Sequence, residues 1–80
     1  MPAIYRAEGF RFVIWPDDHN PPHIHIFKAG AELIIDRGSG NAEPSIRNVY
    51  RMTTRDIGIA FALTEAHNDM FLKRWKEIQQ

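Results

Sequence analysis

Residues 23–37 read His-Ile-His-Ile-Phe-Lys-Ala-Gly-Ala-Glu-Leu-Ile-Ile-Asp-Arg and contain the clearest β-hairpin pattern of the chain. Polar and apolar side chains alternate over residues 23–28, which is the period of two expected of a strand with one buried face. The dipeptide Ala29-Gly30 is short enough for a tight turn, and residues 31–37 supply a second apolar segment. The sequence therefore predicts two antiparallel strands joined by a hairpin.

A similar alternation occurs upstream of the hairpin. Residues 10–15 read Phe-Arg-Phe-Val-Ile-Trp, so that alternate side chains share one face, and Pro16 ends this strand. A further strand around residues 45–47 has a weaker pattern and follows a glycine-containing turn at residues 38–41. The predicted sheet therefore has three or four antiparallel strands.

From Thr54 onward the pattern changes to that of a helix. Thr53 or Thr54 can cap its N-terminus, and Asn68-Asp69 is the place where a kink or break is expected. Apolar residues recur at three- and four-residue steps, at Ile57, Ala60, Phe61, Leu63, Phe71, Trp75 and Ile78. We therefore predict an α+β fold in a single domain over residues 1–80, with a small antiparallel sheet of three or four strands packed on one long C-terminal helix.

The composition excludes several functional classes. The chain has 80 residues, ten Lys plus Arg against ten Asp plus Glu, and no cysteine. Without cysteine it has no disulfide, no thiolate zinc site, no iron–sulfur cluster and no cysteine nucleophile. The zero net charge gives no indication of nucleic-acid binding. No apolar run approaches the ~20 residues that span a bilayer, so we expect a cytoplasmic protein without a membrane segment.

The most unusual feature is residues 17–25, Asp-Asp-His-Asn-Pro-Pro-His-Ile-His, which hold three of the four histidines. The two prolines fix their own backbone and predict a stiff loop. If the following strand buries Ile24, then His23 and His25 point out of the other face, with backbones ~6.6 Å apart at ~3.3 Å per residue. Two imidazoles at that spacing can converge on one ion.

The metal hypothesis uses His23 and His25 as neutral nitrogen ligands of zinc, iron or manganese. The third ligand is then His19, Asp17 or Asp18, with a coordination position left for water. The path of the loop decides between these candidates, and spacing alone does not give that path.

A catalytic hypothesis without metal uses the same two residues. His23 and His25, one protonated and one neutral, serve as general acid and general base, and Arg6, Arg11 or Arg37 stabilises developing charge. The structural alternative is that the prolines shape a turn. The imidazoles then hydrogen-bond carbonyls and carboxylates, and these bonds hold the loop against the sheet.

The face of the sheet without a helix is a candidate partner surface. Val13, Trp15 and Phe27 lie on that face of the predicted strands, so they predict an exposed apolar patch. Together with His19 and Asn20 of the loop, Trp15 and Phe27 are the residues expected to contact a partner protein or a second copy of the chain.

Four segments of the chain form a recognisable set: Met1-Pro2-Ala3-Ile4, Gly9-Phe10, the loop Asp18-His19-Asn20-Pro21-Pro22-His23-Ile24-His25, and residues 67–75. Together they resemble the bacterial domain-of-unknown-function family numbered 4160. The resemblance implies an unassigned activity. It also implies a neighbouring gene for a small protein of the unknown-function family numbered 2442, in a pair often described as a toxin–antitoxin module.

These observations favour a partner-binding component of such a two-gene module, with the stiff loop from His19 to His25 as its functional surface. The alternative is a toxin-like nuclease or other hydrolase in which His23 and His25 perform the chemistry, with or without a divalent metal. DNA binding in autoregulation ranks lowest because the sequence has no helix-turn-helix pattern and no net basic charge. The sequence leaves open whether the chain is an enzyme.

Overall fold

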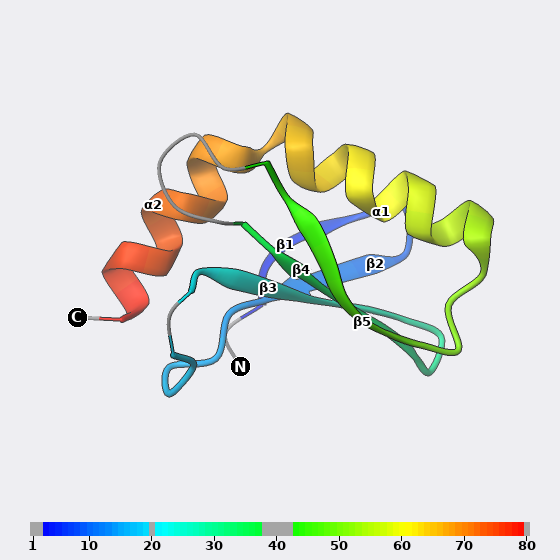
Figure 1. Cartoon of the computed structure of the whole chain (residues 1–80), viewed down its shortest axis with the longest axis horizontal. Helices are drawn as coiled ribbons and strands as arrows, with labels where there is room; N and C mark the ends of the chain where they lie inside the picture. The colour runs from blue at the N-terminus through cyan, green and yellow to red at the C-terminus, as the bar shows by residue number, and fades with distance from the viewer. Residues whose placement is uncertain (1–2, 20, 38–42, 80) are drawn as a thin grey trace.

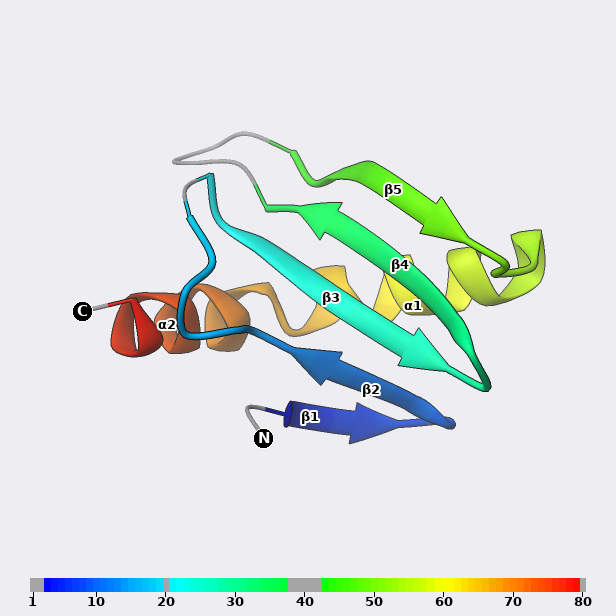
Figure 2. The same cartoon turned by 90° about the horizontal axis from the view of Figure 1, so that it is seen from below.

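A computed structural model describes residues 3–19, 21–37 and 43–79. These residues form five strands and two helices: β1 (Ala3–Ala7), β2 (Phe10–Val13), β3 (His23–Lys28), β4 (Ala31–Asp36), β5 (Ser45–Tyr50), α1 (Thr54–Ala66) and α2 (Asn68–Ile78). The strands lie in the order β1-β2-β3-β4-β5, and each pairs antiparallel with its neighbour (Figures 1 and 2). The α+β class is therefore confirmed, with more strands than the sequence predicts.

Two tight turns of the same kind shape the first half of the sheet. Glu8-Gly9 joins β1 to β2 and Ala29-Gly30 joins β3 to β4, and all four residues have positive φ, between 49° and 83°. Positive φ at both central positions is the type I′ geometry, whose twist matches that of paired strands. Glycine tolerates this backbone without strain at the second position of each turn. The predicted hairpin at residues 23–37 is confirmed.

The helices cover one face of the sheet and leave the other uncovered (Figure 1). The covered face is apolar, and Phe12 of β2 stacks on Phe71 of α2 with ring centroids 5.3 Å apart. The core contains further buried side chains from β2, β3, β4, both helices and the segments that follow β2 and β5, namely Phe10, Ile14, Ile24, Ile26, Leu33, Ile35, Met52, Ala60 and Trp75. Burial of each large apolar side chain contributes about 1.5–3 kcal/mol to folding.

The predicted single long helix is corrected: the segment forms two helices that meet at His67, one residue before the kink or break expected at Asn68-Asp69. Thr53 caps α1 by accepting a hydrogen bond from Asp56 N at 3.1 Å, as predicted. At this junction the His67 ring packs 4.4 Å from Tyr5 of β1, and its Nδ1 lies 3.0 Å from Leu63 O. In the part of the chain that is described, neither helix is long and apolar enough to cross a membrane.

Two strand predictions are corrected. The structure adds β1, which the sequence analysis does not predict, and extends the weak strand at residues 45–47 to the full β5. The glycine-containing turn predicted at residues 38–41 lies outside the described residues. The upstream strand ends at Val13, because residues 14–22 leave the sheet and form the connection to β3.

Candidate functional site: three ligand atoms under the proline loop

Hydrogen bonds fix the connection between β2 and β3 near both of its ends. Asp18 N donates to Trp15 O at 3.1 Å, and Trp15 N donates back to Asp18 Oδ2 at 3.0 Å. Beyond the prolines, Arg37 N of the β4 end donates to Pro22 O at 2.7 Å. These bonds fix both ends of the loop, so the Asp18 side chain has a defined position at this end of the sheet.

Asp18 points between the two histidines of β3. Its Oδ2 lies 3.5 Å from His23 Nε2 and 3.3 Å from His25 Nε2, and one ligand atom from each residue falls within 4.8 Å of the other two. All three side chains are largely shielded from solvent, with exposed fractions of 14% for Asp18, 6% for His23 and 13% for His25. The alternation of β3 places both imidazoles on the face without helices, as predicted.

The other ring nitrogen of each histidine is already engaged. His23 Nδ1 lies 2.9 Å from Pro21 O, and His25 Nδ1 lies 3.1 Å from Glu32 Oε2. A carbonyl oxygen and an ionised carboxylate only accept hydrogen bonds, so each Nδ1 carries the proton and donates it. In the neutral imidazoles, each Nε2 therefore presents a lone pair toward Asp18.

With both imidazoles neutral, this arrangement brings three acceptor atoms together without a donor between them. His25 Nε2 is buried and has no hydrogen-bond partner among the described residues, although Asp18 Oδ2 is 3.3 Å away. An imidazolium–carboxylate hydrogen bond would bring nitrogen and oxygen to about 2.7–2.9 Å. Ligand atoms held ~2.1 Å from a tetrahedral zinc ion are instead ~3.4 Å apart. The Asp18 Oδ2 distances of 3.5 Å to His23 Nε2 and 3.3 Å to His25 Nε2 match the second case, and the two histidine nitrogens lie within 4.8 Å of each other.

An aromatic shell surrounds the cluster. The His23 ring lies 5.1 Å from Trp75 of α2, and the Trp15 ring meets the edge of His25 at 6.4 Å. The C-terminal end of α2 is tied to the loop because Gln79 Nε2 donates to Trp15 O at 3.0 Å. Aromatic walls and buried ligands reduce water access, which strengthens electrostatic interactions in the site.

The structure brings together three of the five candidate metal ligands. His19 and Asp17 are exposed and do not belong to the cluster of Asp18, His23 and His25. Asn20, predicted to contact a partner, lies outside the described residues.

The predicted exposed patch of Val13, Trp15 and Phe27 is wrong. Val13 is fully buried, and Trp15 and Phe27 are partly buried. Trp15 and Phe27 both flank His25, and the Phe27 ring lies nearly parallel to it at 6.4 Å. Their role here is to enclose the cluster rather than to form a broad apolar surface.

Sequence reasoning missed Glu32 and Trp75 as site residues. The hairpin register offered a signal for Glu32, because it pairs with Phe27 and is therefore a diagonal neighbour of His25 on the same face. No local signal existed for Trp75, since its contact with His23 depends on how α2 packs across the end of the sheet.

The three candidate arginines lie in different environments. Arg6 and Arg11 are exposed cross-strand neighbours on β1 and β2. Arg37 is buried, and its guanidinium hydrogen-bonds Asn68 Oδ1 between the two helices. Burial lowers the pKa of Arg37, and the nearby Glu65 carboxylate opposes this effect. Arg37 therefore serves the junction between sheet and helices, and only Arg6 and Arg11 face solvent.

Comparison with known proteins agrees with the sequence motifs. The family model described as "Domain of unknown function (DUF4160)" matches residues 9–76. The chain belongs to the DUF4160 family. The match contains Asp18, His23, His25 and Glu32, so the whole cluster is part of the DUF4160 region. No curated protein and no solved structure matches the chain significantly.

Proposed function

We propose that this DUF4160 domain binds one divalent transition metal through Asp18 Oδ2, His23 Nε2 and His25 Nε2 and uses it for hydrolysis. The proposal is supported by the convergence of three lone-pair atoms whose separations fit ligands of one ion. Two imidazoles and one carboxylate suit zinc, iron(II) and manganese(II). Three protein ligands leave coordination positions for water and substrate, which is the pattern of a catalytic rather than a structural site.

The residues of the chain have separate roles in this proposal. Asp18, His23 and His25 would hold a divalent cation that would supply Lewis-acid chemistry, polarising a substrate oxygen and activating water near neutral pH. Glu32 holds His25 in the tautomer that offers Nε2, and Pro21 O does the same for His23. Trp15 N holds the Asp18 carboxylate in place. The metal-free alternative needs a protonated ring donating to Asp18, and the spacings of 3.3 and 3.5 Å favour it less.

Metal removal tests the proposed function. Protein stripped with a chelator and dialysed is expected to hydrolyse an activated phosphodiester, bis(p-nitrophenyl) phosphate, no faster than buffer does. One equivalent of zinc, manganese or iron(II) should restore turnover, because the cluster holds a single ion. Turnover at the same rate in stripped and metal-loaded protein would contradict the proposal, and so would stoichiometric metal without any turnover above the free ion.

A partner-binding role is the second candidate, and it is supported by β5. Every residue of this edge strand is exposed, including Ile46 (46%), Val49 (41%) and Tyr50 (54%). An exposed edge strand can pair with a strand of another protein, and exposed apolar side chains beside it add buried area. We propose this edge as the surface for the small protein of a toxin–antitoxin-type pair.

Co-elution tests the β5 proposal. The chain co-expressed with the product of its neighbouring gene is expected to elute in gel filtration as a complex. Replacement Ile46→Lys should abolish the complex, because it puts a charge into the buried contact, while metal content stays unchanged. The proposal fails if the unmodified chain elutes alone, or if Ile46→Lys elutes as the complex does.

A further inference from the structure

One row of side chains crosses the whole uncovered face of the sheet. The strand register places Arg6 of β1 opposite Arg11 of β2, Arg11 opposite Phe27 of β3, Phe27 opposite Glu32 of β4, and Glu32 opposite Tyr50 of β5. Residues directly opposite in a sheet point to the same face. Four strand spacings of ~4.8 Å give the row a length of ~19 Å. We call this set the basic-aromatic row.

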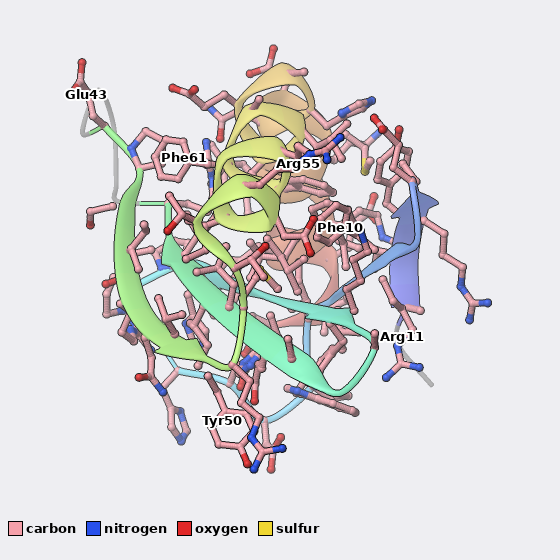
Figure 3. All side chains as sticks on the ribbon, turned by 90° about the vertical axis from the view of Figure 1, so that its right-hand side faces the viewer. Phe10, Arg11, Glu43, Tyr50, Arg55 and Phe61 are labelled. Atoms are coloured by element: carbon pink, nitrogen blue, oxygen red, sulfur yellow. The ribbon has the colours of Figure 1, made fainter. Side chains whose placement is uncertain are left out.

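The basic-aromatic row projects into solvent, away from the helices. Figure 3 shows Arg11 and Tyr50 below the sheet, whereas Arg55 and Phe61 lie on the helix side. Arg6 and Arg11 are exposed, and Tyr50 is 54% exposed. An open depression of about 390 Å³ is lined by Arg11, Phe27, Glu32 and Tyr50 together with the β3–β4 turn. A ligand can therefore reach these side chains without a change in the fold.

Charge and aromaticity are arranged in order along the row. Arg6 and Arg11 make one end of the row basic. Arg51 follows the other end and adds a positive charge there, since its guanidinium lies 5.4 Å from the Tyr50 ring. The aromatic rings of Phe27 and Tyr50 lie between these ends, and the Arg11 guanidinium lies 5.2 Å from the Phe27 ring. Glu32 is the single acidic member, and its Oε2 is occupied by His25 Nδ1.

The geometry points to a single-stranded nucleic acid as the ligand of this row, with bases against the exposed Tyr50 ring and phosphates against Arg6 and Arg11. Aromatic side chains on a sheet stack bases of any sequence, and arginines bind the backbone between them. A duplex fits less well, because its bases are covered and the row offers too few cations to replace base contacts. The zero net charge of the chain does not oppose this, since the cations are local to one face.

The row also lies beside the metal cluster. The Phe27 ring is nearly parallel to the His25 ring, with centroids 6.4 Å apart and planes at 8°. Phe27 is therefore shared between the row and the metal cluster. The assignment of this nucleic acid as the substrate rests on the proposed hydrolytic function, whereas its binding does not.

Binding is tested with chelator-stripped protein, so that it is separated from metal chemistry. The probe is a fluorescein-labelled 12-nucleotide oligouridylate followed by fluorescence anisotropy, with oligothymidylate and a duplex of the same length as comparisons. Arg6→Ala/Arg11→Ala is expected to reduce the slope of log affinity against log salt by about 1.4, because two phosphate contacts are lost. Tyr50→Ala, at an exposed edge position, should weaken binding by about 5- to 150-fold.

The control variant is Arg55→Ala, which removes an exposed arginine from the helix side and should bind the probe as the unmodified chain does. Absence of probe binding, binding that Arg6→Ala/Arg11→Ala leaves unchanged, or equal affinity for the duplex would overturn the inference. Binding to the stripped protein without cleavage after metal addition would leave the inference standing and contradict the hydrolytic function. Metal-dependent phosphodiesterase activity without probe binding would support the hydrolytic function and overturn the inference of nucleic-acid binding.

Discussion

A chain carrying His23→Ala and His25→Ala is expected to bind no divalent metal at concentrations that saturate the unmodified protein. The replacements remove two of the three converging ligand atoms and leave Asp18 as a single carboxylate, which holds a transition metal weakly in water. Equilibrium dialysis followed by elemental analysis measures the loss directly. Circular dichroism of the same samples establishes that the sheet and helices remain.

A graded series of variants makes this prediction specific. His19→Ala changes an exposed histidine of the same loop outside the cluster and should leave affinity unchanged. Glu32→Ala removes the acceptor of His25 Nδ1 and should weaken metal binding by about 10- to 100-fold, as is typical for such outer partners. Asp18→Asn keeps the side-chain volume and should abolish stoichiometric binding. This variant therefore tests the site even if the double histidine variant unfolds. One equivalent of metal retained by Asp18→Asn and by the folded double variant would contradict the metal site.

The chain with Phe71→Ala is expected to lose about 3–5 kcal/mol of stability, because the replacement leaves a cavity in the core. Phe71 is 1% exposed, stacks on Phe12 and meets the edge of Tyr5 at 6.1 Å. An 80-residue domain has a total stability of only about 4–12 kcal/mol. The loss is therefore a large fraction of the total stability, and Phe71→Ala should unfold at a much lower urea concentration than the unmodified chain.

Urea denaturation followed by tryptophan fluorescence measures this loss, since Trp75 lies on the same helix. Lys73→Ala serves as the control: it is exposed on α2 and should change stability by less than about 0.5 kcal/mol. A loss below about 1 kcal/mol for Phe71→Ala would mean that α2 does not pack on the sheet as described.

Local patterns predicted the parts of the fold that local interactions determine. Alternation and the Ala29-Gly30 turn predicted the β3–β4 hairpin, and Thr53 predicted the start of α1. The segment Ala3–Ala7 carries no comparable alternation, so β1 is specified by its pairing with β2 and by the Glu8-Gly9 turn. The break between the helices was expected at Asn68-Asp69 and lies at His67, whereas the contact of His67 with Tyr5 joins residues far apart in sequence and had no local signal.

For the candidate site too, the sequence predicted only what the local backbone determines. The period of a strand predicted that His23 and His25 share a face, because this follows from the backbone alone. The choice of Asp18 over Asp17 and His19 depends on loop hydrogen bonds to Trp15 and from Arg37, and these exist only in the folded sheet. Glu32, Trp75 and the basic-aromatic row likewise depend on strand register or helix packing rather than on neighbouring residues.

The metal centre is the central claim, and a crystal structure of the zinc-loaded chain with anomalous diffraction at the zinc edge tests it most directly. We expect one anomalous peak about 2.0–2.2 Å from His23 Nε2, His25 Nε2 and Asp18 Oδ2, with Glu32 still bonded to His25 Nδ1. No peak at this position in crystals grown with excess zinc, or Asp18 within about 2.8 Å of a protonated ring nitrogen in its place, would contradict the account.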